Sequence, residues 1–257
     1  MEKEYTFILP CLNEEKTLEY CIKEIQKTIE EKNLDAEILV SDNGSTDNSI
    51  KIAEKNGVRV VICKEKGYGS ALINGTNNAK GKYCIMGDSD GSYDFYNIDD
   101  FIKKLKEGYE LVVGNRFKGG IEKGAMSISH KLGVRFLSNI ANLIFDTPVK
   151  DYHCGLRAYE TERLKKLKLS HKGMEYASEM IIIAKLNNLK IVEVPTKLKK
   201  DLRDRKSHLK TIRDGWKHLK LIFKFSIILV QISWIYGNIF KTNQSPEAQF
   251  PVIDHEN

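Results

Sequence analysis

Over the first 115 residues, short apolar runs of strand length alternate with stretches whose apolar residues recur at helical spacing. The short runs predict strands and the stretches between them predict helices. Because strand and helix follow each other in turn, we expect a doubly wound α/β layer with a mainly parallel sheet. The predicted strands are Tyr5–Pro10, Ala36–Ser41, Val58–Cys63, Tyr83–Met86 and Leu111–Val113, and the predicted helices begin near Asn13 and at Thr46 or Asp47 and span Lys66–Asn78 and Ile98–Lys106.

The pattern weakens in the second half of the chain. The glycine-containing stretch Phe117–Ser129 predicts a mobile loop. Helical spacing returns over His130–Phe145 and again over Met174–Leu186. The run Ile191–Leu198 predicts a strand, and Pro195 within it favours a position at the edge of the sheet because proline cannot donate to a ladder.

The net charge of +6 is concentrated near the C-terminus. Between residues 197 and 224, eleven Lys or Arg stand against three Asp, and His208–Phe225 has the spacing of a basic amphipathic helix. The overlapping stretch Leu221–Phe240 is mostly apolar and carries Trp234 and Tyr236. A basic segment followed by apolar and aromatic residues favours a membrane surface over a nucleic acid as partner. A core helix or a contact between copies of the chain is the alternative, so self-association stays open.

The apolar stretch is a poor candidate for a membrane span. A span needs about 20 mostly apolar residues, whereas Ser226, Gln231 and Ser233 interrupt this one. We therefore expect it to lie in the membrane interface. The chain is accordingly divided into a folded domain over residues 1–200, a basic loop, amphipathic helix and membrane-associating segment over 201–240, and a disordered tail over 241–257.

Composition agrees with one large folded domain and an appendage. The chain has 257 residues, of which 41% are apolar and 30% charged, as in ordinary soluble domains. Its five cysteines are odd in number and widely spaced, without a Cys-x-x-Cys pair, which predicts reduced core thiols. The N-terminus lacks the basic and apolar regions of a signal peptide. We therefore expect a cytoplasmic location.

The sharpest chemical signal is a pair of carboxylates directly after the fourth predicted strand. Asp88 and Asp90 are two residues apart, so in extended backbone both side chains point to the same side. Ligands of parallel α/β sheets bind beyond the carboxyl ends of the strands. Two carboxylates there suit Mg²⁺ or Mn²⁺, which would neutralise a diphosphate. A polar turn is the alternative, and an EF-hand is excluded because Gly91 and Tyr93 fall at the wrong loop positions.

Residues that follow the first two strands are expected at the same edge of the sheet. Asp42, Asn43 and Gly44 close the second strand and are expected to line the same crevice, where the Asp42 carboxylate would accept from a base N–H or a ribose hydroxyl group. Ser45, Thr46 or Asp47 then caps the next helix. Pro10, Leu12, Asn13 and Glu14 form the rim after the first strand.

Several common phosphate-binding and hydrolytic motifs are absent from the sequence. The stretch Gly67–Leu72 departs from a dinucleotide fingerprint because Leu72 stands at the third glycine position. No phosphate-loop motif and no nucleophile-elbow motif occurs. The sequence therefore excludes phosphate-loop NTPases and the common α/β hydrolases.

Taken in order, the motifs of this chain resemble those of family 2 glycosyltransferases with the GT-A fold, and most closely the branch of dolichyl-phosphate mannosyltransferases and bacterial polyprenyl-phosphate glycosyltransferases. The resemblance runs from about residue 5 to 225. The family usually shows two Asp where this chain has Asp42 and Asn43. The motifs are PCLNE from Pro10, SDNGSTD from Ser41, KGYGSAL from Lys66, GDSDGSYDF from Gly87, GNRF from Gly114, DYHCGLRAY from Asp151 and KDLRDRKSHLKTIRDGW from Lys200.

The resemblance implies a mixed, mainly parallel sheet and an inverting transfer of a hexose from a UDP- or GDP-sugar to a polyprenyl phosphate at the cytoplasmic membrane face. It implies that Asp88 and Asp90 hold Mg²⁺ or Mn²⁺ and that Asp90, Arg116 and Asp151 are catalytic. The acceptor phosphate would meet Arg116, Ser138 and a cation on the next helix, either Arg135 or Lys131. The implied donor-binding residues are Pro10, Leu12, Glu14, Asp42, Lys66, Gly69, Asp88, Ser89, Asp90, Arg205 and Ser207.

The acceptor decides whether a general base is needed. A phosphate monoester is already anionic at pH 7, since its second pKa is about 6, and it needs cationic positioning only. A saccharide or protein hydroxyl would instead require a carboxylate base, such as Asp151, Glu175 or Glu179. A non-enzymatic nucleotide-binding or membrane scaffold is a further alternative. The run from Arg203 to Ser207 either folds over the donor diphosphate or is a solvated charged stretch, and neither His153 nor His208 is assigned to a metal.

Overall fold

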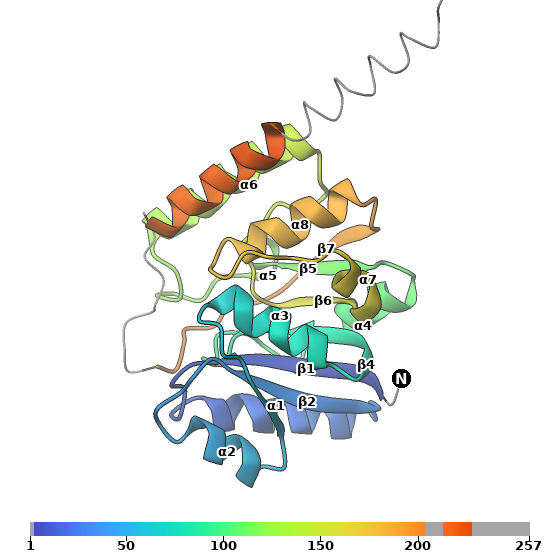
Figure 1. The fold of residues 1–257 in the computed structure, drawn as a ribbon, viewed down its shortest axis with the longest axis vertical. Coiled ribbons are helices and arrows are strands. Elements are labelled where there is room, and N and C mark those ends of the chain that lie inside the picture. The colour runs from blue at the N-terminus through green and yellow to red at the C-terminus, as the bar shows by residue number, and fades with distance from the viewer. Residues whose placement is uncertain (1–2, 204–212, 228–257) are drawn as a thin grey trace, which may run out of the picture.

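The computed structural model describes residues 3–203 and 213–227 of the chain. Its centre is a seven-stranded sheet in the order β3-β2-β1-β4-β6-β5-β7 (Figure 1). β6 is antiparallel to both of its neighbours, and the other paired strands run parallel. The strands are β1 (Lys3–Cys11), β2 (Ala36–Asp42), β3 (Arg59–Ile62), β4 (Gly81–Met86), β5 (Leu111–Asn115), β6 (Arg157–Glu160) and β7 (Ile191–Pro195).

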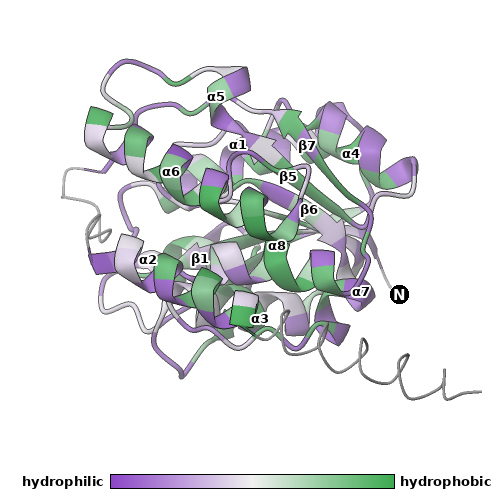
Figure 2. Ribbon diagram, turned by 90° about the horizontal axis from the view of Figure 1, so that it is seen from above, coloured by the Kyte–Doolittle hydropathy of each residue, from purple (hydrophilic) through white to green (hydrophobic). Residues whose placement is uncertain are grey.

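Helices pack against the sheet and complete the hydrophobic core. Helix α3 contacts β1 and β2, while α4 contacts β5 and β6. Helix α8 is apolar along almost its whole length (Figure 2), because nearly all of its residues are buried. The helices are α1 (Leu18–Glu31), α2 (Ser49–Lys55), α3 (Tyr68–Asn78), α4 (Asp99–Lys106), α5 (Arg116–Gly119), α6 (Ile128–Phe145), α7 (Thr161–Lys166) and α8 (Tyr176–Leu186), and residues 213–227 are also helical.

The expected mixed, mainly parallel α/β fold is confirmed, and all six predicted strands are present. β7 lies at the edge of the sheet, as Pro195 indicated. The strand ends at Pro195 and does not reach Leu198 as predicted. The sequence pattern missed β6, which is inserted between β4 and β5. β6 has only four residues, too few for an alternating pattern to stand out.

Several local details differ from the predictions or refine them. The first helix begins at Leu18, because residues 14–17 form a turn before it. The stretch predicted as a loop opens with the short helix α5, and α6 begins at Ile128 after Ser127, whose hydroxyl accepts from the His130 N–H. All five cysteines are buried and free, which confirms the prediction of reduced core thiols.

The C-terminal segment is described only in part. Residues 213–227 are helical, in agreement with the predicted amphipathic helix. Within the described ranges, no helix combines the length and the apolar character that a membrane crossing requires. The predicted basic loop around Arg205 and Ser207, the rest of the apolar stretch and the tail over 241–257 lie outside the described residues.

Candidate active site

The candidate site is a cavity of about 510 Å³ at the carboxyl end of the parallel strands. Residues that follow β1, β2, β4 and β5 line it. Because β6 is antiparallel, the residues that precede it reach the same edge. Among the predicted site residues, those that line the cavity are Pro10, Leu12, Glu14, Lys66, Asp88, Ser89, Asp90 and Arg116.

Asp88 and Asp90 both line this cavity, as their spacing after β4 predicts. Asp88 Oδ1 accepts a hydrogen bond from the Tyr68 hydroxyl at 2.8 Å. Asp90 Oδ1 accepts from the Ser92 N–H at 3.0 Å. A Cβ at position 155 would lie 2.9 Å from Asp88 Oδ2, so Gly155 leaves room for the carboxylate. The Tyr68 hydroxyl and the Ser92 backbone N–H therefore position the two carboxylates.

The electrostatics of this pair fit a hard cation. Burial, together with the negative charge of Asp90, raises the pKa of Asp88 to about 6. The negative charge of Asp90 thus makes a negatively charged Asp88 unfavourable, and a bound cation would relieve this repulsion; oxygen ligands are those that Mg²⁺ and Mn²⁺ prefer. Within the part of the chain that the structure describes, no three His, Cys, Asp or Glu side chains converge on one point. The protein would thus supply two ligands and leave the remaining positions to substrate or water.

Arg203 supplies positive charge to the same carboxylates. Its Nη2 lies 2.5 Å from Asp90 Oδ2, and its Nη1 lies 3.5 Å from Glu14 Oε1. The Leu202 N–H donates to the Asp90 carbonyl, which holds Leu202 against the loop after β4. Arg203 belongs to the run that was expected either to fold over the donor diphosphate or to be solvated, and no sequence signal indicated its contacts with Asp90 and Glu14.

The loops after β1 and β4 are tied together at the rim. The Ser89 hydroxyl donates to the Pro10 carbonyl at 2.6 Å, and the Thr17 hydroxyl donates to the Ser89 carbonyl at 2.7 Å. Thr17 also donates to the Glu14 carboxylate at 3.2 Å. Hydrogen bonds therefore connect Pro10, Ser89 and Glu14 at a rim that Leu12 also lines. Pro10, Leu12 and Glu14 were predicted as rim residues, and the resemblance implied Ser89 as a donor-binding residue.

Beyond β2 the structure agrees with the prediction in part. Asn43 lines the cavity, as expected, whereas Asp42 does not. The Asp42 carboxylate is buried and accepts from the N–H groups of Gly44 and Ser45, at 2.9 Å for Gly44. Such an aspartate turn uses the oxygens that sequence analysis assigned to a nucleoside. Lys66 lines the cavity and donates to the Asn43 carbonyl at 2.8 Å.

Gly69 lies outside the cavity lining and has a packing role. A Cβ at this position would lie 2.2 Å from the carbonyl oxygen of His171 and 2.8 Å from Cβ of Tyr176. Only glycine allows α3 to approach this segment so closely. The neighbouring Gly67 is the glycine of this motif that lines the cavity.

Arg116 and Asp151 form a buried ion pair on the β5 side of the cavity. Arg116 Nε donates to Asp151 Oδ2 at 2.8 Å, and Arg116 Nη2 donates to Asp151 Oδ1 at 2.7 Å. The backbone N–H of Arg116 adds a third bond, to Oδ2 at 3.1 Å. Arg116 lines the cavity, whereas Asp151 is wholly enclosed and does not. The resemblance implied a catalytic role for Asp151; given its enclosed place and its bonds to the guanidinium, we propose that it positions Arg116.

The two other predicted acceptor residues lie elsewhere. Arg135 is exposed on α6, with its guanidinium 4.6 Å from the centre of the Phe117 ring. Ser138 is buried, and its hydroxyl accepts from the Tyr152 N–H at 3.2 Å. Neither residue lines the cavity.

Three histidines line the cavity, and the sequence predicted a role for none of them. His130 comes from α6, His153 from the loop before β6 and His218 from the helix over 213–227. The rings of His153 and His218 meet edge to face with centres 4.3 Å apart. Isolated histidines far apart in a sequence give no spacing signal, so only the fold brings them together.

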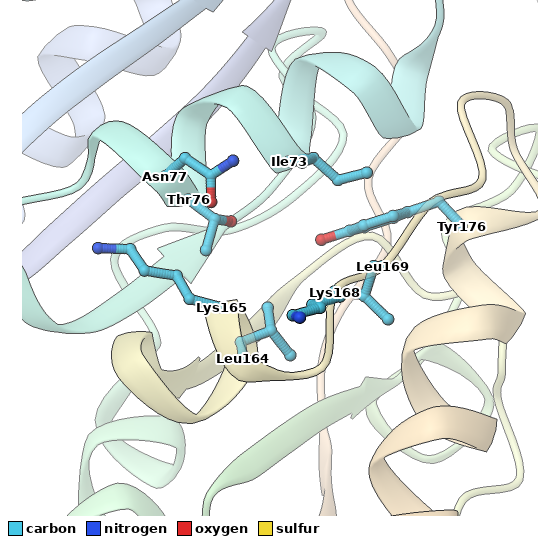
Figure 3. Close-up of a pocket in the computed structure, with 8 residues that line it drawn as sticks. All are labelled: Ile73, Thr76, Asn77, Leu164, Lys165, Lys168, Leu169 and Tyr176. Carbon is cyan, nitrogen blue, oxygen red and sulfur yellow. The ribbon is translucent and has the colours of Figure 1, made fainter.

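A second, smaller hollow of about 190 Å³ lies between α3 and α7 (Figure 3). Its charged lining residues are Lys165 and Lys168, and the ring of Tyr176 forms one wall. It contains no carboxylate. The cavity at the strand ends is therefore the better candidate for a metal-assisted reaction.

Comparison with known proteins agrees with this geometry. The family model described as glycosyl transferase family 2 matches residues 6–168. The chain is 32% identical over 217 residues to a low-salt glycan biosynthesis hexosyltransferase from Haloferax volcanii. The match covers 84% of this chain but only 52% of that protein. The chain thus spans about half the length of that relative.

A second relative matches over most of its length. The chain is 33% identical over 214 residues to the UDP-N-acetylglucosamine–dolichyl-phosphate N-acetylglucosaminyltransferase of Methanococcus voltae, with 74% of this chain and 83% of that protein covered.

Among solved structures, glucosyl-3-phosphoglycerate synthase from Mycobacterium tuberculosis bound to UDP superposes with a TM-score of 0.68 at 21% identity. The match covers 87% of this chain and 80% of that one, and the same enzyme is also solved with Mn²⁺, UDP-glucose and phosphoglyceric acid. This likeness confirms the GT-A fold. With a family match over more than half of its residues, the chain belongs to glycosyl transferase family 2.

Proposed function

We propose that this protein transfers a hexosyl group from a UDP- or GDP-sugar to a polyprenyl phosphate, with inversion at the anomeric carbon. The donor diphosphate lies at the Asp88 and Asp90 end of the cavity, and the acceptor phosphate lies at Arg116. The observation that carries the proposal is the pairing of Arg116 with Asp151, which presents a fixed cation and removes a carboxylate base from the β5 side of the site.

The acidic groups near the site support a phosphate acceptor. Asp151 is enclosed by its bonds to Arg116, and Glu179 accepts from the Ser170 and His171 N–H groups away from the cavity lining. A hydroxyl acceptor would need such a carboxylate as base. A phosphate needs none, because it is anionic near neutral pH, and it gains from an oriented cation.

At the donor end, Asp88 and Asp90 would hold Mg²⁺ or Mn²⁺ together with diphosphate oxygens. When bound, the divalent ion neutralises the charge that develops on the leaving nucleoside diphosphate. Lys66 and Glu14 line the same end and would bind the nucleotide, with Pro10, Leu12 and Ser89 as rim. Arg205 and Ser207, which lie outside the described residues, remain proposed contacts to the diphosphate.

Arg116 acts on the nucleophile. Its side-on pair with Asp151 uses Nε and Nη2 and leaves Nη1 on the other side of the guanidinium. A phosphate oxygen bound there would be held for attack on the anomeric carbon from the face opposite the diphosphate. Most of the rate gain would come from this positioning.

What the relatives bind is consistent with this proposal. The Methanococcus relative is named for a UDP-sugar donor and a dolichyl-phosphate acceptor, and the Mycobacterium enzyme was solved with UDP and Mn²⁺. We propose a UDP- or GDP-sugar, a divalent cation and a lipid phosphate as the ligands of this chain.

A lipid acceptor requires the protein to work at a membrane, which we propose is the cytoplasmic face. Large apolar side chains on α6 are exposed, including Ile128, Leu132 and Phe136 at four-residue spacing. The helix over 213–227 also exposes Trp216 and Phe223 beside lysines. Apolar side chains with neighbouring cations suit an anionic lipid surface. We propose that residues 201–240 contribute to this attachment.

The proposal is tested with the purified full chain, labelled UDP-glucose, UDP-N-acetylglucosamine and GDP-mannose, Mn²⁺ and undecaprenyl or dolichyl phosphate. One donor should give a chloroform-soluble product, and EDTA should abolish its formation. Products that are found only on water-soluble glycans or peptides would instead support transfer to a hydroxyl acceptor.

A further inference from the structure

His153 is the least satisfied polar side chain of the cavity wall. Its imidazole lines the cavity, and both ring nitrogens are shielded from solvent without a hydrogen-bond partner. A buried polar group without a partner costs free energy, typically about 1–3 kcal/mol. Such a group at a cavity wall therefore points to a ligand that completes its hydrogen bonds.

The backbone is held in place both before and after His153. The buried Arg157 guanidinium donates to the Tyr152 carbonyl at 2.7 Å and to the Cys154 carbonyl at 2.9 Å. The Gly155 N–H donates to the Tyr93 hydroxyl at 2.7 Å. The carbonyls before and after His153 are thus both held by one arginine, and the imidazole is preorganised.

The surroundings of His153 keep its ring neutral. Burial, and then the neighbouring His218, Arg116 and Arg157, lower the pKa of His153 well below its ordinary value. His218 Nδ1 lies 2.8 Å from the Ser178 hydroxyl, so its ring is anchored to α8. A neutral imidazole has one N–H donor and one nitrogen acceptor. That combination matches a hydroxyl group, which donates and accepts, better than it matches a phosphate.

His153 shares one cavity with the proposed donor site. It lines this cavity together with Asp88, Asp90 and Arg116. Two residues after it, Gly155 lies against Asp88 Oδ2, at the diphosphate end. A group bound at His153 would thus lie in the same cavity as the diphosphate, to which the transferred sugar is attached.

We infer that His153 is a specificity residue that binds a hydroxyl group of the transferred sugar. This inference rests on the proposed nucleotide-sugar donor but not on the proposed lipid acceptor. His153 holds the sugar ring through one hydrogen bond given and one received, and it thereby selects among hexoses that differ at that hydroxyl.

The test compares the dissociation constants of a nucleotide sugar and of its free nucleoside diphosphate, measured by calorimetry with Mn²⁺. The pairs are UDP-glucose and UDP-N-acetylglucosamine against UDP, and GDP-mannose against GDP. The variants are His153→Phe, which keeps the ring but removes both hydrogen-bonding nitrogens, and His153→Gln, which can still donate and accept. His171→Gln, outside the cavity lining, is the matched control.

For the preferred donor, His153→Phe should weaken binding of the nucleotide sugar about tenfold and leave binding of the nucleoside diphosphate unchanged. His153→Gln should recover most of this loss, and His171→Gln should behave like the wild type. Because both nitrogens lack partners in the folded protein, His153→Phe should not lower the midpoint of thermal unfolding. A structural role would lower that midpoint without affecting the sugar preference.

The inference is overturned if His153→Phe binds both ligands as the wild type does, or weakens both equally. It also falls if the wild type binds no nucleotide sugar, a result that removes the proposed donor as well. Sugar binding that depends on His153, combined with no transfer to prenyl phosphate, would instead remove only the proposed acceptor.

Discussion

The two ends of the cavity each hold an arginine paired with an aspartate, but the two pairs differ in enclosure. Arg116 and Asp151 meet through two side-chain bonds, and their side chains are 6% and 0% exposed. Arg203 and Asp90 meet through one close contact, with 14% and 8% of the side chains exposed. Arg116 follows directly from β5, whereas Arg203 belongs to no helix or strand.

This difference separates a fixed cation from an exchangeable one. The Asp151 carboxylate accepts hydrogen bonds from Arg116, is enclosed and does not line the cavity. Asp90 faces the cavity beside Asp88, and Arg203 provides the positive charge that a divalent ion would provide. We therefore propose that one pair shapes the site permanently, whereas the other would rearrange on binding of a cation and a diphosphate.

Removal of Asp151 should have the largest effect on the fold. Asp151→Ala leaves the Arg116 charge buried without its partner, so we expect the free energy of unfolding to fall by about 3–5 kcal/mol. Denaturation by urea measures this change. Asp90→Ala, which breaks the more exposed pair, should lower the same quantity by less. Equal losses for both variants would contradict the distinction between the pairs.

Removal of Asp90 should have the largest effect on activity that leaves the fold intact. Asp90→Ala removes one of two proposed cation ligands, so we expect kcat to fall about 10²-fold or more at saturating Mn²⁺. Single-turnover assays with the preferred donor measure this loss. Asp94→Ala, an aspartate outside the cavity lining, is the control and should retain activity. An active Asp90→Ala enzyme would rule out the cation site.

The pH dependence of cation binding follows from Asp88, whose pKa is raised to about 6. The proton and the cation compete for this carboxylate, so Mn²⁺ affinity should be constant above pH 7 and fall up to tenfold per pH unit below pH 6. Calorimetric titrations between pH 5 and 8 test this. The Asp88→Asn variant should bind Mn²⁺ weakly, and its Mn²⁺ affinity should no longer show this dependence on pH.

The smallest expected effect concerns the exchangeable pair. Arg203→Ala removes the cation that competes for Asp90, so Mn²⁺ should bind a few-fold more tightly in the absence of nucleotide. Arg203→Lys should bind Mn²⁺ much as the wild type does. Weaker Mn²⁺ binding by Arg203→Ala would show that the arginine supports the cation site and does not compete with the ion.

Much of the donor end could be predicted from the sequence because its signals are local. Asp88 and Asp90 follow an apolar strand at two-residue spacing, and Pro10 and Glu14 follow another. Parallel strands bring such ends together by rule. The prediction for Asp42 was wrong because its carboxylate accepts from the N–H groups of its own turn. The spacing of residues alone does not show whether a carboxylate binds such N–H groups or a ligand.

The acceptor end could not be predicted to the same extent because its contacts are long-range. Ser138 is held by Tyr152 across the loop before β6, and a four-residue strand gave no pattern to place that loop. Helical register alone put Arg135 near the acceptor, but its guanidinium stacks on Phe117. His153 gained its surroundings only from the packing of three separate segments.

The most direct test of this division of the cavity is a two-substrate kinetic comparison of Arg116→Lys and Asp90→Asn. Arg116→Lys keeps the charge but loses the side-on geometry, and it should raise KM for the prenyl phosphate while KM for the nucleotide sugar stays unchanged. Asp90→Asn should do the reverse. If both variants change KM for the same substrate, the two ends of the cavity do not have separate roles.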